Sequence, residues 1–330
     1  MASINTNASA LQALQSLNAT NKNLEATQSR ISTGYRVADA SDNAAYWSIA
    51  TTMRSDNKAL STVQDALGLG SSKIDTAYTG MNKAIETVND IKVKLVAANG
   101  ASAADKEKYD TEIKALQGQL KSYADAATFS GANWLSVDTT TGHTTAGTFN
   151  DIKIVAAFNR DASGAVTIAT IDVKVQDIKL YDAYATATGL NDGILDAVRL
   201  GTTGARNAAA QVPTAGAVPA AGDTYTVSTL SVKDHSDAQI MQMLTVTEAA
   251  LEEMTTAATN LGAAKTRVDL QKTFTSSLMD SIDRGIGQLV DADMNKESTR
   301  LQALQVQQQL GIQALSIANS NAQSIISLFR

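Results

Sequence analysis

Both ends of this 330-residue chain carry long apolar repeats with a period of seven residues. Leu17, Leu24 and Ile31 stand seven apart near the N-terminus, and a second repeat of this kind runs to the C-terminus. An apolar stripe with this period is the contact seam of a helix that packs along another helix. Chain ends normally lose order first, so both ends are predicted to be buried against something. The predicted terminal seam consists of Leu14, Leu17, Leu24, Ile31, Leu301, Leu304, Leu315, Ala318, Ala322, Ile325 and Phe329.

A second set of seven-residue repeats predicts a helical bundle inside these ends. One helix is expected over roughly 44–98, a rod on the order of 75 Å at 1.5 Å per residue. Asn99-Gly100 ends it, and Ser102 or Asp105 can start a further helix. Three helices, one of them on the C-terminal side, can pack as an antiparallel bundle. The predicted bundle core consists of Leu60, Leu67, Ile74, Met81, Val88, Leu95, Leu116, Leu120, Met254, Leu261 and Val268.

The middle of the chain has a different pattern. Ile152–Phe158, Val166–Val175 and Tyr225–Val232 are rich in β-branched residues and partly alternate. Gly, Asp, Ser and Thr clusters separate them, which predicts short strands and turns. Tyr181–Leu200 could hold one short helix.

The patterns together predict a mainly α protein. Both chain ends form a long antiparallel, coiled-coil helical bundle, and a small α+β domain is inserted in the middle. The predicted boundaries are 1–43 for the N-terminal helix and the segment after it, 44–138 for the N-terminal part of the bundle, 139–236 for the α+β domain, 237–284 for the C-terminal part of the bundle, and 285–330 for the C-terminal helix.

Composition restricts the partners. The formal net charge of -6 argues against nucleic acid or an anionic membrane as the main partner. The chain has no cysteine, so disulfides and thiol chemistry are excluded. No run approaches the roughly 18 apolar residues of a membrane span. Met1–Leu11 lacks the basic and apolar regions of a secretion signal, so any export is expected to use another route.

The chemistry of an active site is not expected. His143 and His235 each stand alone in a turn-rich segment, without the spacing of a metal site. Asp291 and Asp293 are two apart, so on a helix they would point in different directions. Gly68-Leu69-Gly70 lies inside a helical repeat with no preceding strand, unlike a phosphate-binding loop. The sequence predicts no catalytic residue, no metal and no cofactor.

Three segments resemble bacterial flagellin, the filament subunit of the flagellum. Ser29–Val37 with Ala40–Ala50 resembles the segment that joins the family's first helix to its spoke. Thr128–Leu135 resembles the turn that ends the family's shorter helix, and Gln302–Arg330 is similar to its final helix. The resemblance covers about the first 140 and the last 90 residues. A hook–filament junction protein, whose ends are similar but diverge more, is the alternative.

The resemblance implies an assembly and a set of partners. Copies of the chain would stack into a tube whose inner wall is formed by 1–43 and 285–330, with the bundle outside and the variable middle on the surface. The chain would be secreted unfolded through the hollow flagellum. Its partners would be other copies of itself, a filament cap protein, a hook-associated junction protein and a flagellin export chaperone, with copolymerisation with related flagellins left open.

The resemblance also implies a segment that meets the innate immune system. In many flagellins the stretch corresponding to Val88–Leu95 is bound by the Toll-like receptor that senses flagellin, and a basic residue there is important. This chain has Asn89 and Asp90 beside Ile91 and Leu95. Because the charge is reversed, weak or absent activation of that receptor is predicted.

Burial of the terminal repeats is expected to drive assembly. An isolated subunit cannot bury both terminal seams well, so the ends are expected to be largely disordered until assembly. Each buried Leu or Ile contributes about 1.5–3 kcal/mol, and a repeated contact that does not close gives an open filament. Asn21, Gln28, Gln308 and Gly311 interrupt the seam and could set its register. Trp47 is expected to be a buried packing residue, with a contact to neighbouring copies as the alternative.

Overall fold

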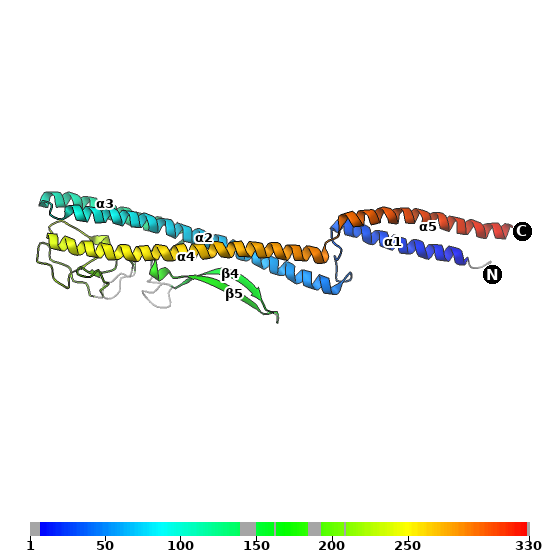
Figure 1. The fold of residues 1–330 in the computed structure, drawn as a ribbon, viewed down its shortest axis with the longest axis horizontal. Helices are drawn as coiled ribbons and strands as arrows, with labels where there is room; N and C mark the ends of the chain where they lie inside the picture. The colour runs from blue at the N-terminus through cyan, green and yellow to red at the C-terminus, as the bar shows by residue number, and fades with distance from the viewer. Residues whose placement is uncertain (1–6, 139–149, 162, 184–192, 208, 329–330) are drawn as a thin grey trace. The chain divides into compact units, whose positions relative to one another are not determined.

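A computed structural model describes residues 7–138, 150–161, 163–183, 193–207 and 209–328, with side chains up to residue 320 (Figure 1). Five long helices frame a strand-rich middle. The helices are α1 (Ala8–Thr33), α2 (Ala44–Ala98), α3 (Ala103–Ala126), α4 (Asp237–Val290) and α5 (Met294–Leu328). The strands are β1 (Thr128–Phe129), β2 (Ala132–Asn133), β3 (Ser136–Val137), β4 (Ile152–Arg160), β5 (Val166–Val173), β6 (Tyr181–Asp182), β7 (Arg199–Leu200) and β8 (Thr224–Tyr225).

Side-chain caps explain where the helices begin. Asn7 accepts from the backbone N–H of Ala10 at 3.1 Å before α1, and Ser102 accepts from that of Asp105 at 3.3 Å before α3. Asn43 Oδ1 accepts from two backbone N–H groups in the first turn of α2, each at 3.1 Å. A short polar side chain at this position satisfies donors that the helix leaves free. The polar residues that punctuate the sequence therefore fix the helix starts.

The chain divides into two compact units. The terminal unit consists of residues 1–59 and 277–330, and the bundle unit consists of residues 60–276. Helices α2 and α4 contribute to both units. The division falls inside these helices, whereas the sequence placed boundaries at 43/44 and 284/285. The bounds of the five predicted segments stay predictions.

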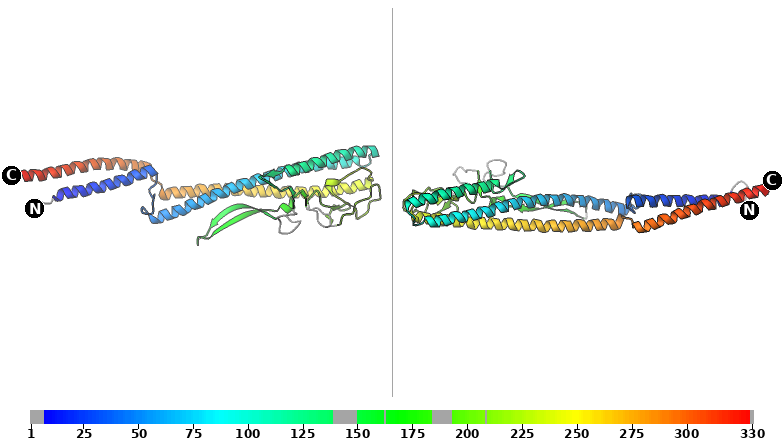
Figure 2. Two further views of the ribbon diagram at one scale, coloured as in Figure 1. Left: turned by 180° about the vertical axis from the view of Figure 1, so that it is seen from behind. Right: turned by 90° about the horizontal axis from the view of Figure 1, so that it is seen from above.

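In the terminal unit, α1 and α5 lie side by side (Figure 2). Val37, Ala50, Ile286 and Val290 form a small buried cluster where α2 begins and α4 ends. The segment after α1 is tied to this cluster, since the N–H groups of Arg36 and Val37 donate to Val290 O at 2.6 and 3.2 Å.

The link between α4 and α5 corrects one expectation. Asp291 and Asp293 do not lie on a helix. Asp291 forms a β-bridge with Tyr35, and Asp293 Oδ1 accepts from the N–H of Asn295 at 3.0 Å at the start of α5. The backbone of Asp291 and the carboxylate of Asp293 therefore take part in ending one helix and starting the next.

In the bundle unit, α2, α3 and α4 pack together around a buried apolar core (Figures 1 and 2). Lys92 pairs with Glu248 and Asp75 with Lys265, so α2 and α4 run antiparallel. Leu116 of the predicted bundle core is half-buried. The other ten, each at most 4% exposed, are Leu60, Leu67, Ile74, Met81, Val88, Leu95, Leu120, Met254, Leu261 and Val268.

The strands of the middle form short two-stranded ladders. Pairs β1–β2, β4–β5 and β7–β8 are antiparallel, and β3–β6 is parallel. The strand-rich middle predicted from the sequence is confirmed, with β4 and β5 covering most of the two expected runs. The run Tyr225–Val232 is wrong beyond its first residue, since a 3-10 turn follows at Val227–Thr229.

The short helix expected over Tyr181–Leu200 is absent from the described part of that range, 181–183 and 193–200. Those residues form β6, β7 and turns. The N–H groups of Leu180 and Tyr181 both donate to Leu135 O, at 2.8 and 2.9 Å. Pairing with a segment some 45 residues earlier therefore overrides the local preference.

The middle shares its core with the helices. Val175, Leu180 and Val227 belong to the same buried cluster as the long helices, so the described middle is not a compact unit of its own. Gly70 of α2 allows this contact, because a Cβ there would lie 2.6 Å from Ile154 Cγ2 of β4. Of the Gly68-Leu69-Gly70 stretch, Gly70 thus contributes to packing.

Candidate assembly surfaces

Helices α1 and α5 meet along one face of each helix. On α5 the least exposed positions are Glu297, Leu301, Leu304, Gln308, Gly311, Leu315 and Ala318, which alternate in steps of four and three. On α1 they are Ala10, Ala13, Leu17, Thr20, Leu24, Thr27 and Ile31. This spacing is that of a coiled-coil seam. A Cβ at Gly311 would lie 3.2 Å from Leu17 Cδ1, so glycine lets the two helices approach closely.

The second track of the α1 seam differs from the predicted one. Thr20 and Thr27 are 5% and 1% exposed, whereas Leu14 is 43% exposed. Asn21, read as an interruption of the seam, is exposed and accepts from Gln308 Nε2 at 2.8 Å. The hydroxyl group makes threonine a polar residue in a sequence pattern, yet Thr20 Oγ1 donates to Ser16 O at 2.9 Å within its own helix. Only its methyl group then needs an apolar neighbour.

Polar contacts near both ends of the pair fix its register. Asn7 Nδ2 donates to Ala318 O at 3.0 Å near one end. Near the other end Arg30 Nη1 lies 3.5 Å from Glu297 Oε1, and the Glu297 side chain is 9% exposed. Asn7 and Arg30 thus lock α1 against α5 at points far apart along the helix.

Apolar side chains remain on the outer surface of this pair. Val306, Leu310 and Ile317 follow one stripe of α5, each more than half exposed, and Leu11 of α1 is 59% exposed. We call Val306, Leu310 and Ile317 the outer stripe. Exposed aliphatic residues at helical spacing mark a surface that another protein covers. Ala322 and Ile325 belong to α5, but their side chains, like Phe329, lie outside the described part.

The region where α2 begins exposes aromatic side chains. Tyr46 and Trp47 are 42% and 37% exposed, and Ile49 is 50% exposed. The expectation that Trp47 is buried is therefore wrong for the single chain. Arg54 covers the ring of Tyr35 at 4.8 Å, a cation–π contact that holds this part of the surface.

The segment assigned to receptor contact has two faces. Asn89 and Asp90 are exposed, and Asn89 Nδ2 donates to Ile85 O at 3.1 Å. Ile91 and Leu95 are fully buried in the bundle core. Asn89, Asp90 and Val93, the last 63% exposed, are therefore available to a partner on the folded surface, and Lys92 and Lys94 are partly exposed.

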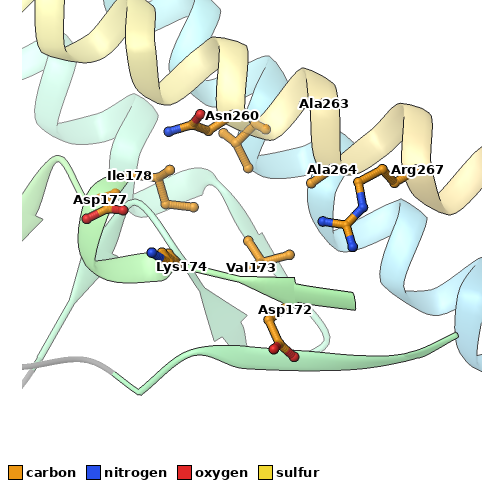
Figure 3. Close-up of a pocket in the computed structure, with 10 residues that line it drawn as sticks. Asp172, Val173, Lys174, Asp177, Ile178, Asn260, Ala263, Ala264 and Arg267 are labelled. Carbon is orange, nitrogen blue, oxygen red and sulfur yellow. The ribbon is translucent and has the colours of Figure 1, made fainter. Parts of the chain in front are cut away.

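A hollow of about 330 Å³ lies between β5 and α4 (Figure 3). Asp172, Lys174 and Asp177 line it on one side, and Asn260 and Arg267 on the other. These polar side chains are exposed and of mixed charge. Among the described residues there is no group of three or more His, Cys, Asp or Glu side chains that could hold a metal ion. His143 lies outside them, and His235 Nδ1 lies 2.8 Å from Lys233 O.

Buried charges fasten the middle of the chain to the bundle. Arg199 is 1% exposed, and its two Nη atoms lie 2.9 and 2.7 Å from the carboxylate oxygens of Glu253 on α4. Arg206 Nη2 also lies 2.8 Å from Glu253. The two guanidinium groups hold the Glu253 pKa at about 2 against the opposing effect of burial. This pairing of residues 54 apart has no local signal in the sequence.

A second buried cluster surrounds β6. Lys179 Nζ lies 2.6 Å from Asp182 Oδ2, and neither side chain is exposed. Asp196 Oδ2 accepts from the Asp182 N–H at 2.9 Å. Burial, reinforced by the nearby Asp182 charge, raises the Asp196 pKa to about 6. Asp196 is therefore a carboxyl group that titrates near neutral pH.

No described helix has a window long and apolar enough to serve as a membrane span.

Comparison with known proteins gives one family at both ends and along the whole chain. The family model of the bacterial flagellin N-terminal helical region matches residues 4–140, and that of the C-terminal helical region matches 244–329. The chain is 47% identical to Flagellin C of Rhizobium meliloti (strain 1021) over the full length of both chains. It is 49% identical to Flagellin of Brucella melitensis biotype 1 and 45% identical to Flagellin A of Rhizobium meliloti (strain 1021), again over the full length of both chains.

These matches give no support to the junction-protein alternative. They agree with the paired terminal helices and with the long helical bundle described above. The chain belongs to the bacterial flagellin family, whose members are structural subunits of the flagellar filament and not enzymes.

Proposed function

We propose that the α1·α5 pair is the part of this chain that binds neighbouring copies along the inner wall of the filament. The observation that carries the proposal is the outer stripe of Val306, Leu310 and Ile317, which the single chain leaves exposed. The terminal seam Leu17, Leu24, Leu301 and Leu315 would hold the pair itself together.

The energetics favour assembly through this surface. Each aliphatic side chain of the outer stripe contributes about 1.5–3 kcal/mol when fully buried. The contact repeats with every added subunit and does not close on itself, which produces an open helical polymer. In the proposed tube the terminal helices would line the inner wall, and the bundle unit and the middle of the chain would lie farther from the axis.

A charge on the outer stripe tests this proposal. Leu310→Asp alters a side chain that is 59% exposed, so the single chain should fold as before. In the filament the carboxylate would be buried without a partner, which costs several kcal/mol for each contact. We expect electron microscopy to find no filaments of Leu310→Asp after seeding, with an unchanged circular dichroism spectrum.

Ser316→Asp is the matched control, because it adds the same charge beside Ile317 but off the outer stripe. It should still polymerise. Normal filaments of Leu310→Asp would sink the assignment of the outer stripe. Leu315→Asp, within the seam, should abolish filaments as well, while the bundle unit stays folded.

The proposed setting is the extracellular flagellum, reached by export of the unfolded chain through the flagellar channel. A filament cap protein, a hook-associated junction protein, an export chaperone and related flagellins are the partners that family membership suggests. Support comes from the resemblance of both ends to flagellin. Co-purification of the monomer with each candidate, and mixed filaments formed with a related flagellin, test these pairings.

Weak or absent recognition by the flagellin-sensing Toll-like receptor is proposed for the Val88–Leu95 segment. Asp90 is exposed and places a negative charge where a basic residue is favourable in other flagellins. A receptor reporter assay with monomer should give little response, and Asp90→Arg should raise it. A strong response to the unmodified chain would contradict the proposal.

A further inference from the structure

The turn between α2 and α3 contains an Asn-Gly pair, a dipeptide in which the asparagine side chain can react with the next backbone nitrogen. Asn99 and Gly100 follow α2 directly and are both exposed. An asparagine side chain is attacked most readily by the next backbone nitrogen when glycine follows, because glycine has no Cβ to block the approach. This turn is therefore the place to look for a spontaneous covalent change.

The reaction is an intramolecular cyclisation followed by hydrolysis. The Gly100 nitrogen loses its proton to water or hydroxide and forms a bond to Cγ of Asn99. The Cγ–Nδ2 bond breaks, and Nδ2 takes up a proton and leaves as ammonia. Water then opens the five-membered imide at either carbonyl, which leaves aspartate or isoaspartate at position 99. No oxidant or reductant takes part.

The structure holds the Asn99 side chain away from this reaction. Asn99 Nδ2 donates to Met241 Sδ of α4 at 3.5 Å. The Asn99 N–H donates to Leu95 O at 3.2 Å and to Val96 O at 3.3 Å, so the backbone continues the helical bonding of α2. Both contacts keep the amide carbon from turning onto the Gly100 nitrogen.

The attacking nitrogen is also engaged. Gly100 has a φ of 78°, and its N–H lies close enough to the carboxylate of Asp237, the first residue of α4, to help lower the pKa of that carboxyl group. Lys106 Nζ lies 2.8 Å from Asp237 Oδ1 and 3.1 Å from His235 O, with only 12% of its side chain exposed. Lys106 and the Gly100 N–H together lower the Asp237 pKa. A carboxylate of lowered pKa is a weak base, so it holds the N–H without removing its proton.

We propose that Asn99 is a site of spontaneous deamidation and that Asp237, positioned by Lys106, sets its rate in the folded chain. The reaction is slow while the start of α4 is in place and proceeds from the state in which this end has opened locally. Each conversion adds a carboxylate close to Asp237. Because like charges repel, a converted chain opens more readily at this end.

The test measures conversion at position 99 in full-length monomer. Wild type, Asp237→Ala and Glu107→Ala are incubated in warm, mildly alkaline buffer, with and without urea, and the peptide containing residue 99 is quantified by mass spectrometry. Folded wild type should react at least ~10-fold more slowly than the same chain in urea. Asp237→Ala should lose most of this protection.

Glu107→Ala is the matched control. It breaks the 2.7 Å ion pair with Lys233 at the same end of the bundle but leaves Gly100 and Asp237 untouched. It should react like wild type. Circular dichroism checks that each variant is folded, and Lys106→Met replaces Asp237→Ala if the latter is not.

Two results would overturn the proposal. One is a folded wild type that reacts as fast as the chain in urea. The other is a folded Asp237→Ala, or Lys106→Met in its place, that reacts as slowly as wild type. The assay uses monomer alone, so its outcome is independent of the proposed assembly surface.

Discussion

The two compact units bury their seven-residue repeats to very different extents. In the bundle unit Leu67, Ile74, Met81 and Val88 are fully buried. In the terminal unit the seam residues Leu17, Leu24, Leu301 and Leu315 are only half-buried, and the fully covered positions of α1 are Thr20 and Thr27. A pair of helices has too little surface to enclose its own seam, whereas three helices and a strand layer can. The same repeat therefore builds a fully buried core in one unit and leaves a half-buried seam in the other, which we propose is completed by assembly.

The largest expected effect comes from replacing a seam isoleucine by alanine, once in the bundle unit and once in the terminal unit. Ile74→Ala removes a fully buried side chain and should lower the free energy of unfolding by about 2–5 kcal/mol. Ile31→Ala removes a half-buried side chain and should cost the monomer about 1 kcal/mol. Urea unfolding followed by circular dichroism measures both. Equal losses would erase the distinction between the two units.

The buried Asp196 makes the bundle unit sensitive to pH. Its pKa in the folded chain is about 6, against an ordinary value of 3.8. The folded state therefore binds the proton more tightly, so this stabilisation is complete below the ordinary value and is lost as pH rises to about 6. A shift of about 2 units corresponds to about 3 kcal/mol. Urea unfolding at several pH values should show that, as pH rises over this range, the free energy of unfolding of wild type falls relative to that of Asp196→Asn.

The control for other titrating groups is Asp161→Asn, which alters an exposed carboxyl group whose pKa is lowered by hydrogen bonds from Ser163 and from backbone N–H groups. The contribution of Asp161 to the pH dependence of the free energy of unfolding should be opposite in sign to that of Asp196. It should also be small, since the Asp161 carboxyl group is exposed. If Asp196→Asn and wild type keep the same stability difference at every pH, the carboxyl group is not held as described.

The smallest effect concerns the threonines of the α1 seam. Thr20→Val replaces a buried hydroxyl by a methyl group, and burial of one such group contributes about 0.8 kcal/mol. The α1·α5 pair should become tighter, and filaments should dissociate at a higher temperature. Thr299→Val is the control, because Thr299 makes the same hydrogen bond to the carbonyl four residues earlier but is exposed. A higher dissociation temperature for the control alone would contradict this account of the seam.

The sequence predicted the long helices well, because aliphatic residues recur at helical spacing over many turns. The start of α3 directly after its N-cap Ser102 and the end of α2 before Asn99-Gly100 follow from capping and turn chemistry. The second track of the α1 seam was missed, since it is made of Ala13, Thr20 and Thr27 and not of large apolar residues.

The middle was harder to predict for a physical reason. Its strands are short, and their partners are distant, as in the pairing of β3 with β6. The Arg199–Glu253 pair joins a strand to a helix 54 residues away. Such contacts join residues that are far apart in the chain, so no local window of sequence contains both partners.

Native-state hydrogen exchange, compared between monomer and filament, tests the central claim most directly. The account predicts that backbone amides of α2, α3 and α4 in the bundle unit are already strongly protected in the monomer. Those of α1 and α5 should exchange rapidly in the monomer and become protected on polymerisation. Equal, strong protection of α1 and α5 in monomer and filament would contradict the claim that the terminal helices complete their packing by assembly.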